Sequence, residues 1–417
     1  MTEYPYEIRC PVHGFVQLNN WEWDIISQPV FQRLRRIRQL AWTDQIYPGA
    51  THTRFEHSLG VMHTASLLYD AIWRNGRNLL EQDLRYNEAG RERFRQFVRL
   101  AALLHDVGHT PFSHAAEELF PERDNGKRYT HEDYSAEIIR SKLRDVIQHH
   151  PANKNFEFRA DVLASFVEGA GDAGSAIFWR ALVAGQMDAD RMDYLLRDSH
   201  HIGVHYGKFD LQRLISSVTV VPGVDGATPE LGINEGGWHA AEALVLARYF
   251  MFTQVYFHKT RVAYDIHIRE AMKTLLPEGL FPKPTAEQLE EFLRWDDWRV
   301  LGLLAAGEGG EHGMRLAHRR HYKRIYQTPE VATKQDLERL DEVRTKLGNL
   351  LAGEARAEKS WYKTGNVDIP ILFRSPQEST KPLSELSSVL RTMKGNNQVL
   401  LYVLPEHREL ANKAIGS

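Results

Sequence analysis

Residues 97–109 join an apolar helical stretch to two adjacent side chains of the metal-ligand type. Apolar residues recur at three- and four-residue spacing from Phe97 to Leu104, which is the period of a buried helix face, and His105 and Asp106 follow directly. A packed core needs neither an imidazole nor a carboxylate at that point. An adjacent imidazole and carboxylate can both bind one divalent cation. The segment therefore predicts a helix that ends at a metal site.

A second helix is predicted after Val61, where apolar residues again recur at helical spacing as far as Ile72. Gly60, Gly108 and Pro111 are expected to bound these helices. Ligands on separate segments could then converge on one site.

Asp190, Tyr194 and Asp198 are spaced i, i+4 and i+8, so a helix over residues 177–199 would project all three from one face. That face is expected to look into the metal site. The alternative is an acidic stripe in contact with solvent, which a tyrosine between the two carboxylates disfavours.

The ligand types form an ordered set, His57, His105, Asp106 and Asp190, although a single His-Asp pair means little in a chain with 20 histidines. The flanking motifs carry more weight, and they are Phe31–Arg35, Gln39–Leu40, Tyr47–Ala50, Arg54–Gly60, His105–His114, Thr130–Glu132 and Asp188–Asp198. With these blocks the chain resembles the HD-domain metal-dependent phosphohydrolases. It is most similar to their deoxynucleoside triphosphate triphosphohydrolase branch, over about its first 270 residues.

Two imidazoles and two carboxylates make a mixed nitrogen and oxygen site for one divalent metal ion. This donor set suits Mn²⁺, Fe²⁺, Zn²⁺ or Ni²⁺ better than Mg²⁺ or Ca²⁺, although magnesium stays open. Four protein ligands leave two octahedral positions for a water and a phosphate oxygen. The ion is therefore expected to orient the α-phosphate and to raise the hydroxide fraction.

A second cluster, which the metal does not need, consists of His109, His114, Glu117 and His131, and its expected role is proton transfer. A departing nucleoside 5′-oxygen is a poor leaving group unless it is protonated. The resemblance implies that these residues lie in the catalytic centre, with His114 as a candidate general acid. The family has an aspartate where Glu117 stands, and the longer side chain leaves open whether Glu117 orients His109 or His131.

The resemblance also indicates phosphate ligands. Arg54 and Arg191 lie close in sequence to the metal ligands, and Arg248 matches the family's phosphate-binding arginine by a looser alignment. A guanidinium offers fixed, charged donors to phosphate oxygens, so these three residues are expected to bind the triphosphate.

Three further residues match the sugar-binding positions of the family. Gln39 and Asp198 match residues that bond the 3′-hydroxyl, and Tyr194 matches the residue whose ring packs against C2′. That ring leaves no room for a 2′-hydroxyl, which implies a preference for deoxyribose.

The predicted function is metal-dependent hydrolysis of deoxynucleoside triphosphates to a deoxynucleoside and inorganic triphosphate. One alternative is an HD phosphatase or phosphodiesterase acting on other nucleotides or on single-stranded nucleic acid, and another is a nucleotide-sensing regulatory module. A homo-oligomer is expected. Gln32, Arg35 and His258–Lys259 match inter-subunit positions that bind a nucleotide in the family, but Ser27 replaces the acidic residue that reads guanine there, so an allosteric nucleotide stays an open question.

The amino-acid composition limits the cellular compartment and the partners that can be expected. The single cysteine, Cys10, permits no intramolecular disulfide and no thiolate zinc cluster, which favours the cytoplasm. A net charge of −3 gives no global attraction for nucleic acid, although local basic clusters can bind phosphates. No apolar run approaches the roughly 20 residues that span a bilayer, so no membrane partner is expected.

The fold is expected to be mostly α, an HD-domain helical bundle with a small β-hairpin and a C-terminal α/β appendage. The predicted divisions are a catalytic core over residues 1–276, a linker and helical segment over 277–334, and a charged helix plus the appendage over 335–417. The predicted elements are a hairpin within 214–233, a helix over 237–276 ended by Pro277, a charged helix over 335–357, and strands at 369–373 and 399–403 around a helix near 383–393.

Overall fold

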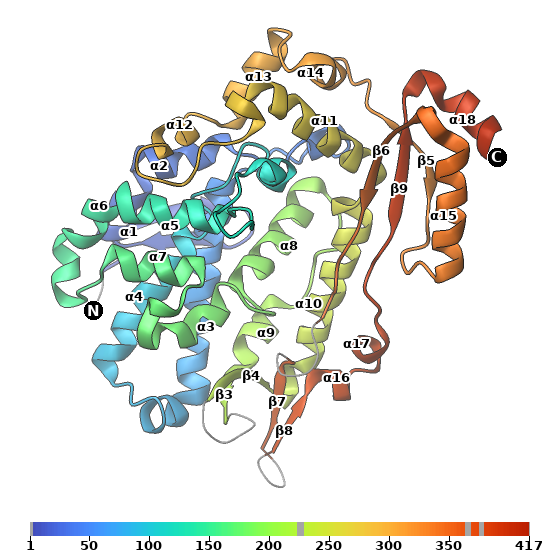
Figure 1. The fold of residues 1–417 in the computed structure, drawn as a ribbon. Helices are drawn as coiled ribbons and strands as arrows, with labels where there is room; N and C mark the ends of the chain where they lie inside the picture. Colours follow the sequence, from blue (N-terminus) through green and yellow to red (C-terminus); the bar gives the residue numbers. More distant parts are fainter. Residues whose placement is uncertain (1–2, 223–228, 363–367, 375–378, 417) are drawn as a thin grey trace.

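Helices make up most of the chain, of which the computed structural model describes residues 3–222, 229–362, 368–374 and 379–416 (Figure 1). The helices of the N-terminal half are α1 (Asn20–Ile26), α2 (Pro29–Gln32), α3 (Arg54–Gln82), α4 (Glu88–Leu104), α5 (His131–Ser141), α6 (Arg144–Gln148), α7 (Ala160–Glu168) and α8 (Ala189–Ile202). The C-terminal half adds α9 (Leu211–Ser217), α10 (Trp238–Met251), α11 (Lys259–Leu275), α12 (Leu289–Leu293), α13 (Asp297–Ala305), α14 (Gly310–Ala317), α15 (Lys334–Leu347), α16 (Leu383–Leu386), α17 (Ser388–Thr392) and α18 (Arg408–Ile415). The mostly α-helical class is confirmed.

Helix α3 is the long central element, and it packs against α4, α8 and the strand β3 (Val218–Val221). It begins at the N-cap Thr53, whose backbone N–H donates to Glu56 Oε1 at 3.2 Å. Gly60 lies inside α3 and does not break it, contrary to the prediction. A side chain at residue 60 would collide with the Asp193 carboxylate, so the glycine allows α8 to approach α3 closely.

Helix α8 starts later than predicted, because Asp188 caps it at Ala189. Asp188 Oδ1 accepts the N–H of Arg191 at 2.8 Å, and Oδ2 accepts the N–H of Gly185 at 2.9 Å. The earlier part of the predicted helix is a separate 3₁₀ segment, η5 (Gly171–Leu182).

The predicted helix over 237–276 is divided into α10, a π-helical turn η7 (Phe252–Tyr256) and α11. His258 has an extended backbone, and its Nδ1 accepts the N–H of Thr260 at 3.3 Å, so α11 begins with its own cap. The end of α11 before Pro277 agrees with the prediction.

The charged helix predicted over 335–357 was wrong in its second half. Helix α15 ends at Leu347, where Gly348 adopts a positive φ of 48°. The chain then forms strand β6 (Leu351–Arg356). The helix expected near 383–393 is present as two short helices, α16 and α17.

Among the described residues, three small sheets accompany the helices. Strands β1 (Tyr6–Cys10) and β2 (Gly14–Leu18) form a hairpin. The predicted hairpin is present as β3 and β4 (Glu230–Asn234), although the expected turn at 223–226 lies outside the described residues. This hairpin extends into a four-stranded sheet of order β3-β4-β7-β8, with β7 (Pro370–Phe373) parallel to β4 and β8 (Ser379–Pro382) at the edge.

The third sheet has the order β5-β9-β6, with β5 (Lys323–Gln327) and β9 (Val399–Val403). Alternate residues of the fully buried β9 point to opposite faces, so Leu401 packs with α15 and α18 while Tyr402 packs against Val262 of α11. The C-terminal region is therefore attached to the helical core at α11 and at β4. After β6, the chain runs down beside α10, where Arg248 contacts Trp361 (Figure 1).

In the described part of the chain, no helix combines the length and the apolar character needed to cross a bilayer.

Candidate active site

Three segments bring the four predicted metal ligands together. His105 follows the last residue of α4, while His57 and Asp190 lie in the first turns of α3 and α8. His57 Nε2 lies 3.0 Å from Asp190 Oδ1 and 3.4 Å from Asp106 Oδ2. His105 Nε2 lies 3.2 Å from Asp106 Oδ1 and 3.7 Å from Asp190 Oδ1. One potential ligand atom from each of His57, His105 and Asp106 lies within 4.8 Å of the other two, and Asp190 lies against both histidines.

The nitrogen atoms of this cluster fit a divalent cation. His105 Nδ1 donates to the carbonyl oxygen of Ala102 at 2.7 Å, and His57 Nδ1 donates to Asp193 Oδ2 at 2.7 Å. Each ring therefore directs its Nε2 at the carboxylates. Burial alone would lower the pKa of both imidazoles, but the carboxylates raise the pKa of His57 to about 9 and that of His105 above its ordinary value, so a divalent cation would bind here in place of protons. His105 Nε2 is buried and has no hydrogen-bond partner among the described residues, which is the environment expected of a metal ligand.

The two carboxylates are ionised at neutral pH. Burial alone would raise the pKa of Asp190, but the adjacent imidazoles of His105 and His57 hold it well below its ordinary value. Burial likewise opposes the charge on Asp106, and the neighbouring His105 and Arg54 lower its pKa well below the ordinary range. Arg54 Nη1 contacts Asp106 directly, so this predicted phosphate ligand lies against the metal ligands themselves.

Asp193 is a site residue that sequence reasoning missed. Its buried carboxylate binds His57 Nδ1 at 2.7 Å, His13 Nε2 at 2.6 Å, and Arg197 through two hydrogen bonds of 2.8 Å each. It thereby fixes the ring orientation of a metal ligand. The signal in the sequence was the i, i+4 spacing of Asp193 and Arg197 on the helix that carries Asp190.

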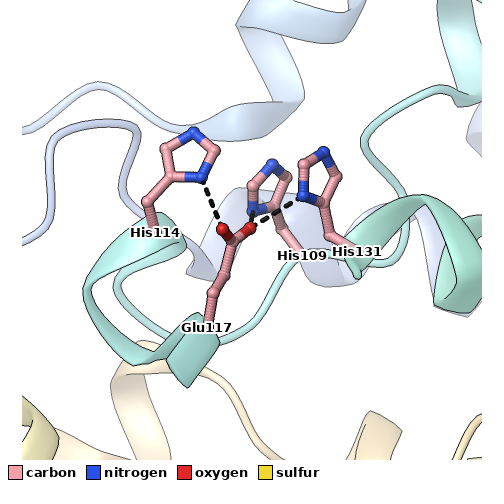
Figure 2. Close-up of side chains that lie close together, drawn as sticks. All are labelled: His109, His114, Glu117 and His131. Carbon is pink, nitrogen blue, oxygen red and sulfur yellow. Dashed lines mark hydrogen bonds and ion pairs between the residues drawn. The ribbon is translucent and has the colours of Figure 1, made fainter. Parts of the chain in front are cut away.

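The second cluster surrounds the carboxylate of Glu117, which lies between three imidazoles in Figure 2. Glu117 stands in the 3₁₀ segment η3 (Ser113–Leu119), with Oε1 2.7 Å from His131 Nδ1 and 3.7 Å from His109 Nδ1. Its Oε2 lies 3.0 Å from His114 Nδ1. The longer glutamate side chain therefore contacts His131 and His114 more closely than His109.

His109 and His131 connect the two clusters. Their rings stack with centroids 4.0 Å apart, and their Nε2 atoms lie 3.3 and 3.8 Å from Asp106 Oδ1. Burial alone would lower the pKa of His131, but Glu117 raises it to about 9. Burial and the nearby Arg54 hold the pKa of His109 well below its ordinary value. At neutral pH His131 and Glu117 are thus an ion pair beside a neutral His109.

A cavity of about 1480 Å³ opens over both clusters. This volume exceeds the roughly 300–1,000 Å³ of pockets for drug-sized ligands, so it has room for a nucleotide with three phosphates. All the predicted substrate residues line it, namely Gln39, Arg54, Arg191, Tyr194, Asp198 and Arg248. The metal ligands His105, Asp106 and Asp190 and the second cluster line the same cavity.

The predicted sugar ligands lie close together around His52. Asp198 accepts hydrogen bonds from His52 Nε2 at 2.7 Å and from the Tyr256 hydroxyl at 2.6 Å. The Gln39 backbone N–H donates to the His52 carbonyl at 3.0 Å. Gln39 Oε1 is buried and has no hydrogen-bond partner in the described ranges, so it is the available acceptor for a substrate hydroxyl. His52 and Tyr256 were not predicted, because their role appears only when distant segments meet.

The C-terminal region supplies one wall of the cavity, and no motif had marked it. Residues 354–361 and 368–370 line the cavity, and Arg248 Nη1 donates to the Trp361 carbonyl at 3.0 Å. Burial and the positive charges of Arg248 and Arg191 lower the pKa of Lys359. Three cationic side chains thus face the same space.

Gly108→Ala is expected to destabilise the protein by about 1–3 kcal/mol, because overpacking against backbone forces a shift. An added Cβ would lie 2.5 Å from the carbonyl oxygen of His131 and 2.7 Å from the carbonyl carbon of Tyr134. Chemical denaturation measures the change. The control is Gly90→Ala, where the nearest atom is Asn87 Oδ1 at 3.4 Å. Equal stabilities of the two variants would contradict the close packing of the His105 loop against α5.

Two family models match the chain. The model described as the HD domain matches residues 54–195, and the model described as the HD associated region matches residues 209–415. The first match includes all four candidate metal ligands. The second includes Arg248 and the cavity wall at residues 354–361.

Relatives are found over most of the chain. YwfO of Bacillus subtilis, an uncharacterized protein, is 30% identical over 397 residues, which cover 89% of this chain and 82% of YwfO. The deoxynucleoside triphosphate triphosphohydrolase SAMHD1 homolog of Dictyostelium discoideum is 30% identical, but the match covers 69% of this chain and only 52% of that protein. The crystal structure of a hypothetical protein from Aquifex aeolicus covers 98% of this chain and 99% of its own, with a TM-score of 0.79 and 29% identity.

Proposed function

The chain belongs to the HD-domain phosphohydrolases, and on that basis we propose that it hydrolyses deoxynucleoside triphosphates to a deoxynucleoside and inorganic triphosphate. The observation that carries the proposal is the composition of one cavity. Metal ligands, a proton-transfer cluster, three cationic side chains and two sugar-binding candidates all line it. The likeness to the Dictyostelium triphosphohydrolase supports the same substrate class.

The roles of the residues follow from their positions. A divalent cation bound by His57, His105, Asp106 and Asp190 would supply Lewis acidity and a water of lowered pKa. Arg191, Arg248 and Lys359 would bind the triphosphate, because all three line the cavity and carry positive charge.

The sugar would lie between Gln39 and Asp198, which offer buried oxygen acceptors. Tyr194 is half-buried, and it lines the cavity together with Arg191 and Arg248. Its ring would then exclude a 2′-hydroxyl. His114, whose side chain is 59% exposed, would give a proton to the departing 5′-oxygen.

Product analysis tests the proposal. The purified protein is incubated with each dNTP and NTP in the presence of Mn²⁺ or Mg²⁺, and the products are separated by chromatography. Inorganic triphosphate and a deoxynucleoside are the expected products. Orthophosphate or pyrophosphate would indicate another phosphohydrolase reaction, and no turnover with any metal would favour the nucleotide sensor.

His114→Ala is expected to lower kcat for a dNTP by about 10²–10⁴-fold, because general acid catalysis contributes that much. A phosphodiester whose leaving group is p-nitrophenolate needs no proton, so its hydrolysis should fall much less. Steady-state kinetics with both substrates measures the difference. His149→Ala is the control, because His149 has a side chain 73% exposed and stands outside the cavity lining. An equal loss with both substrates would contradict the proton-donor role.

A further inference from the structure

The geometry points to a use of the second cluster beyond proton transfer: we propose that His109, His114, Glu117 and His131 form a second transition-metal site. One potential ligand atom from each residue lies within 4.8 Å of the other three. The Nδ1 atoms of all three histidines face the Glu117 carboxylate, as Figure 2 shows for His114 and His131.

The separations suit a small cation. With bonds of about 2.0–2.1 Å, the ligand atoms of a tetrahedral zinc site lie roughly 3.3 Å apart. The distances from Glu117 oxygens to the Nδ1 atoms of His131, His114 and His109 are 2.7, 3.0 and 3.7 Å, which bracket that value. Small side-chain adjustments would bring the four atoms to bonding distance.

Asp106 lies next to the Nε2 atoms of His109 and His131, as a carboxylate commonly does beside a metal-binding histidine. When Nδ1 binds a cation, the ring carries its proton on Nε2, and a carboxylate commonly accepts that proton. His109 Nε2 and His131 Nε2 lie 3.3 and 3.8 Å from Asp106 Oδ1. Asp106 would therefore be a ligand in the first site and a hydrogen-bond acceptor for the second.

The donor set selects the class of ion. Three imidazoles and one carboxylate favour Zn²⁺ or another late first-row metal over Mg²⁺, which prefers oxygen ligands. A second carboxylate, Glu132, lies 3.6 Å from His131 Nδ1 and adds negative charge. The cluster lines the large cavity, and the exposed His114 side chain gives an ion a route from solvent.

Occupation of this site would remove the proton donor. A cation on His114 Nδ1 leaves the ring with a single proton on Nε2, and releasing that proton would form an imidazolate. The metal-bound ring is therefore a much weaker general acid than an imidazolium. This consequence rests on the proposed function, whereas the metal site itself does not. Zinc beyond the first equivalent is thus expected to inhibit turnover.

Metal content is the decisive measurement. The full-length protein is stripped with a chelator, equilibrated with Zn²⁺, passed over a desalting column and analysed by mass spectrometry for zinc per chain. Two zinc ions are expected for the unaltered protein and for His149→Ala, and one for His114→Ala and for Glu117→Gln. One ion in the unaltered protein, or two in both cluster variants, would overturn the proposal.

Co²⁺ gives a second readout that needs no enzymatic activity. A tetrahedral cobalt site absorbs visible light far more strongly than an octahedral one, so the band is expected in the unaltered protein and lost in Glu117→Gln. A band of equal intensity in both proteins would place cobalt elsewhere. If no dNTP is hydrolysed but two zinc ions bind, the proposed function fails while the second site stands.

Discussion

Asp106→Asn is expected to lower dNTP turnover about a thousandfold or more. The Asp106 oxygens lie 3.4 Å from His57 Nε2, 3.2 Å from His105 Nε2 and 3.3 Å from His109 Nε2. Losing the metal removes several kcal/mol of transition-state stabilisation, and each 1.36 kcal/mol is tenfold in rate. Asparagine has nearly the same shape, so the fold should survive, while the bound metal should fall at both clusters.

Two measurements separate this loss from misfolding. Metal content and kcat are compared with those of Asp145→Asn, a change on α6 at a side chain that is 90% exposed. Thermal unfolding confirms that both variants are folded. Full metal content together with full activity in Asp106→Asn would refute the assignment of Asp106 as a metal ligand.

Asp193→Ala is expected to have the largest effect on stability and to lower the free energy of unfolding by about 3–5 kcal/mol. The substitution removes a buried carboxylate, so the buried charge of its partner Arg197 is left unpaired. Arg197 would lose two hydrogen bonds of 2.8 Å, and His13 and His57 would lose their carboxylate. Urea denaturation measures the loss.

Asp193→Asn keeps the shape and tests the second consequence. Since the carboxylate orients His57, its removal is expected to weaken metal binding about 10–100-fold. The control is Asp161→Ala, where a 39% exposed side chain pairs with Arg144 at 2.7 Å and about 1 kcal/mol or less should be lost. Unchanged metal affinity in Asp193→Asn would show that His57 is held by its other contacts.

The positions of those candidate site residues that lie in a distinctive local pattern could be predicted from the sequence. His105 and Asp106 end an apolar helical run, and Asp190 and Tyr194 share a helix face, so periodicity placed each pair locally. The ordered ligand set and the family resemblance predicted that the two pairs meet in one site. In the structure, Asp106 and Asp190 both lie against His57, and Tyr194 lines the same cavity. The roles of these residues in catalysis stay predictions.

Other site residues could not be found this way, because their contacts join distant segments. His13 lies between β1 and β2, yet it binds Asp193 on α8, 180 positions away. Asp198 binds His52, 146 positions away. The break before α11 was missed because the wide turn at Phe252–Tyr256 leaves the apolar spacing intact, and only the extended backbone of His258 reveals the new helix start.

The wall of the cavity formed by residues 354–361 has an evolutionary consequence. The atoms that would perform the reaction are encoded before residue 200, whereas part of the cavity surface that would meet the substrate is encoded more than 150 residues later. Substitutions in the late segment can alter which base or how many phosphates fit, without touching a metal ligand. Members of this family can therefore diverge in the nucleotide they select while keeping one unchanged reaction centre.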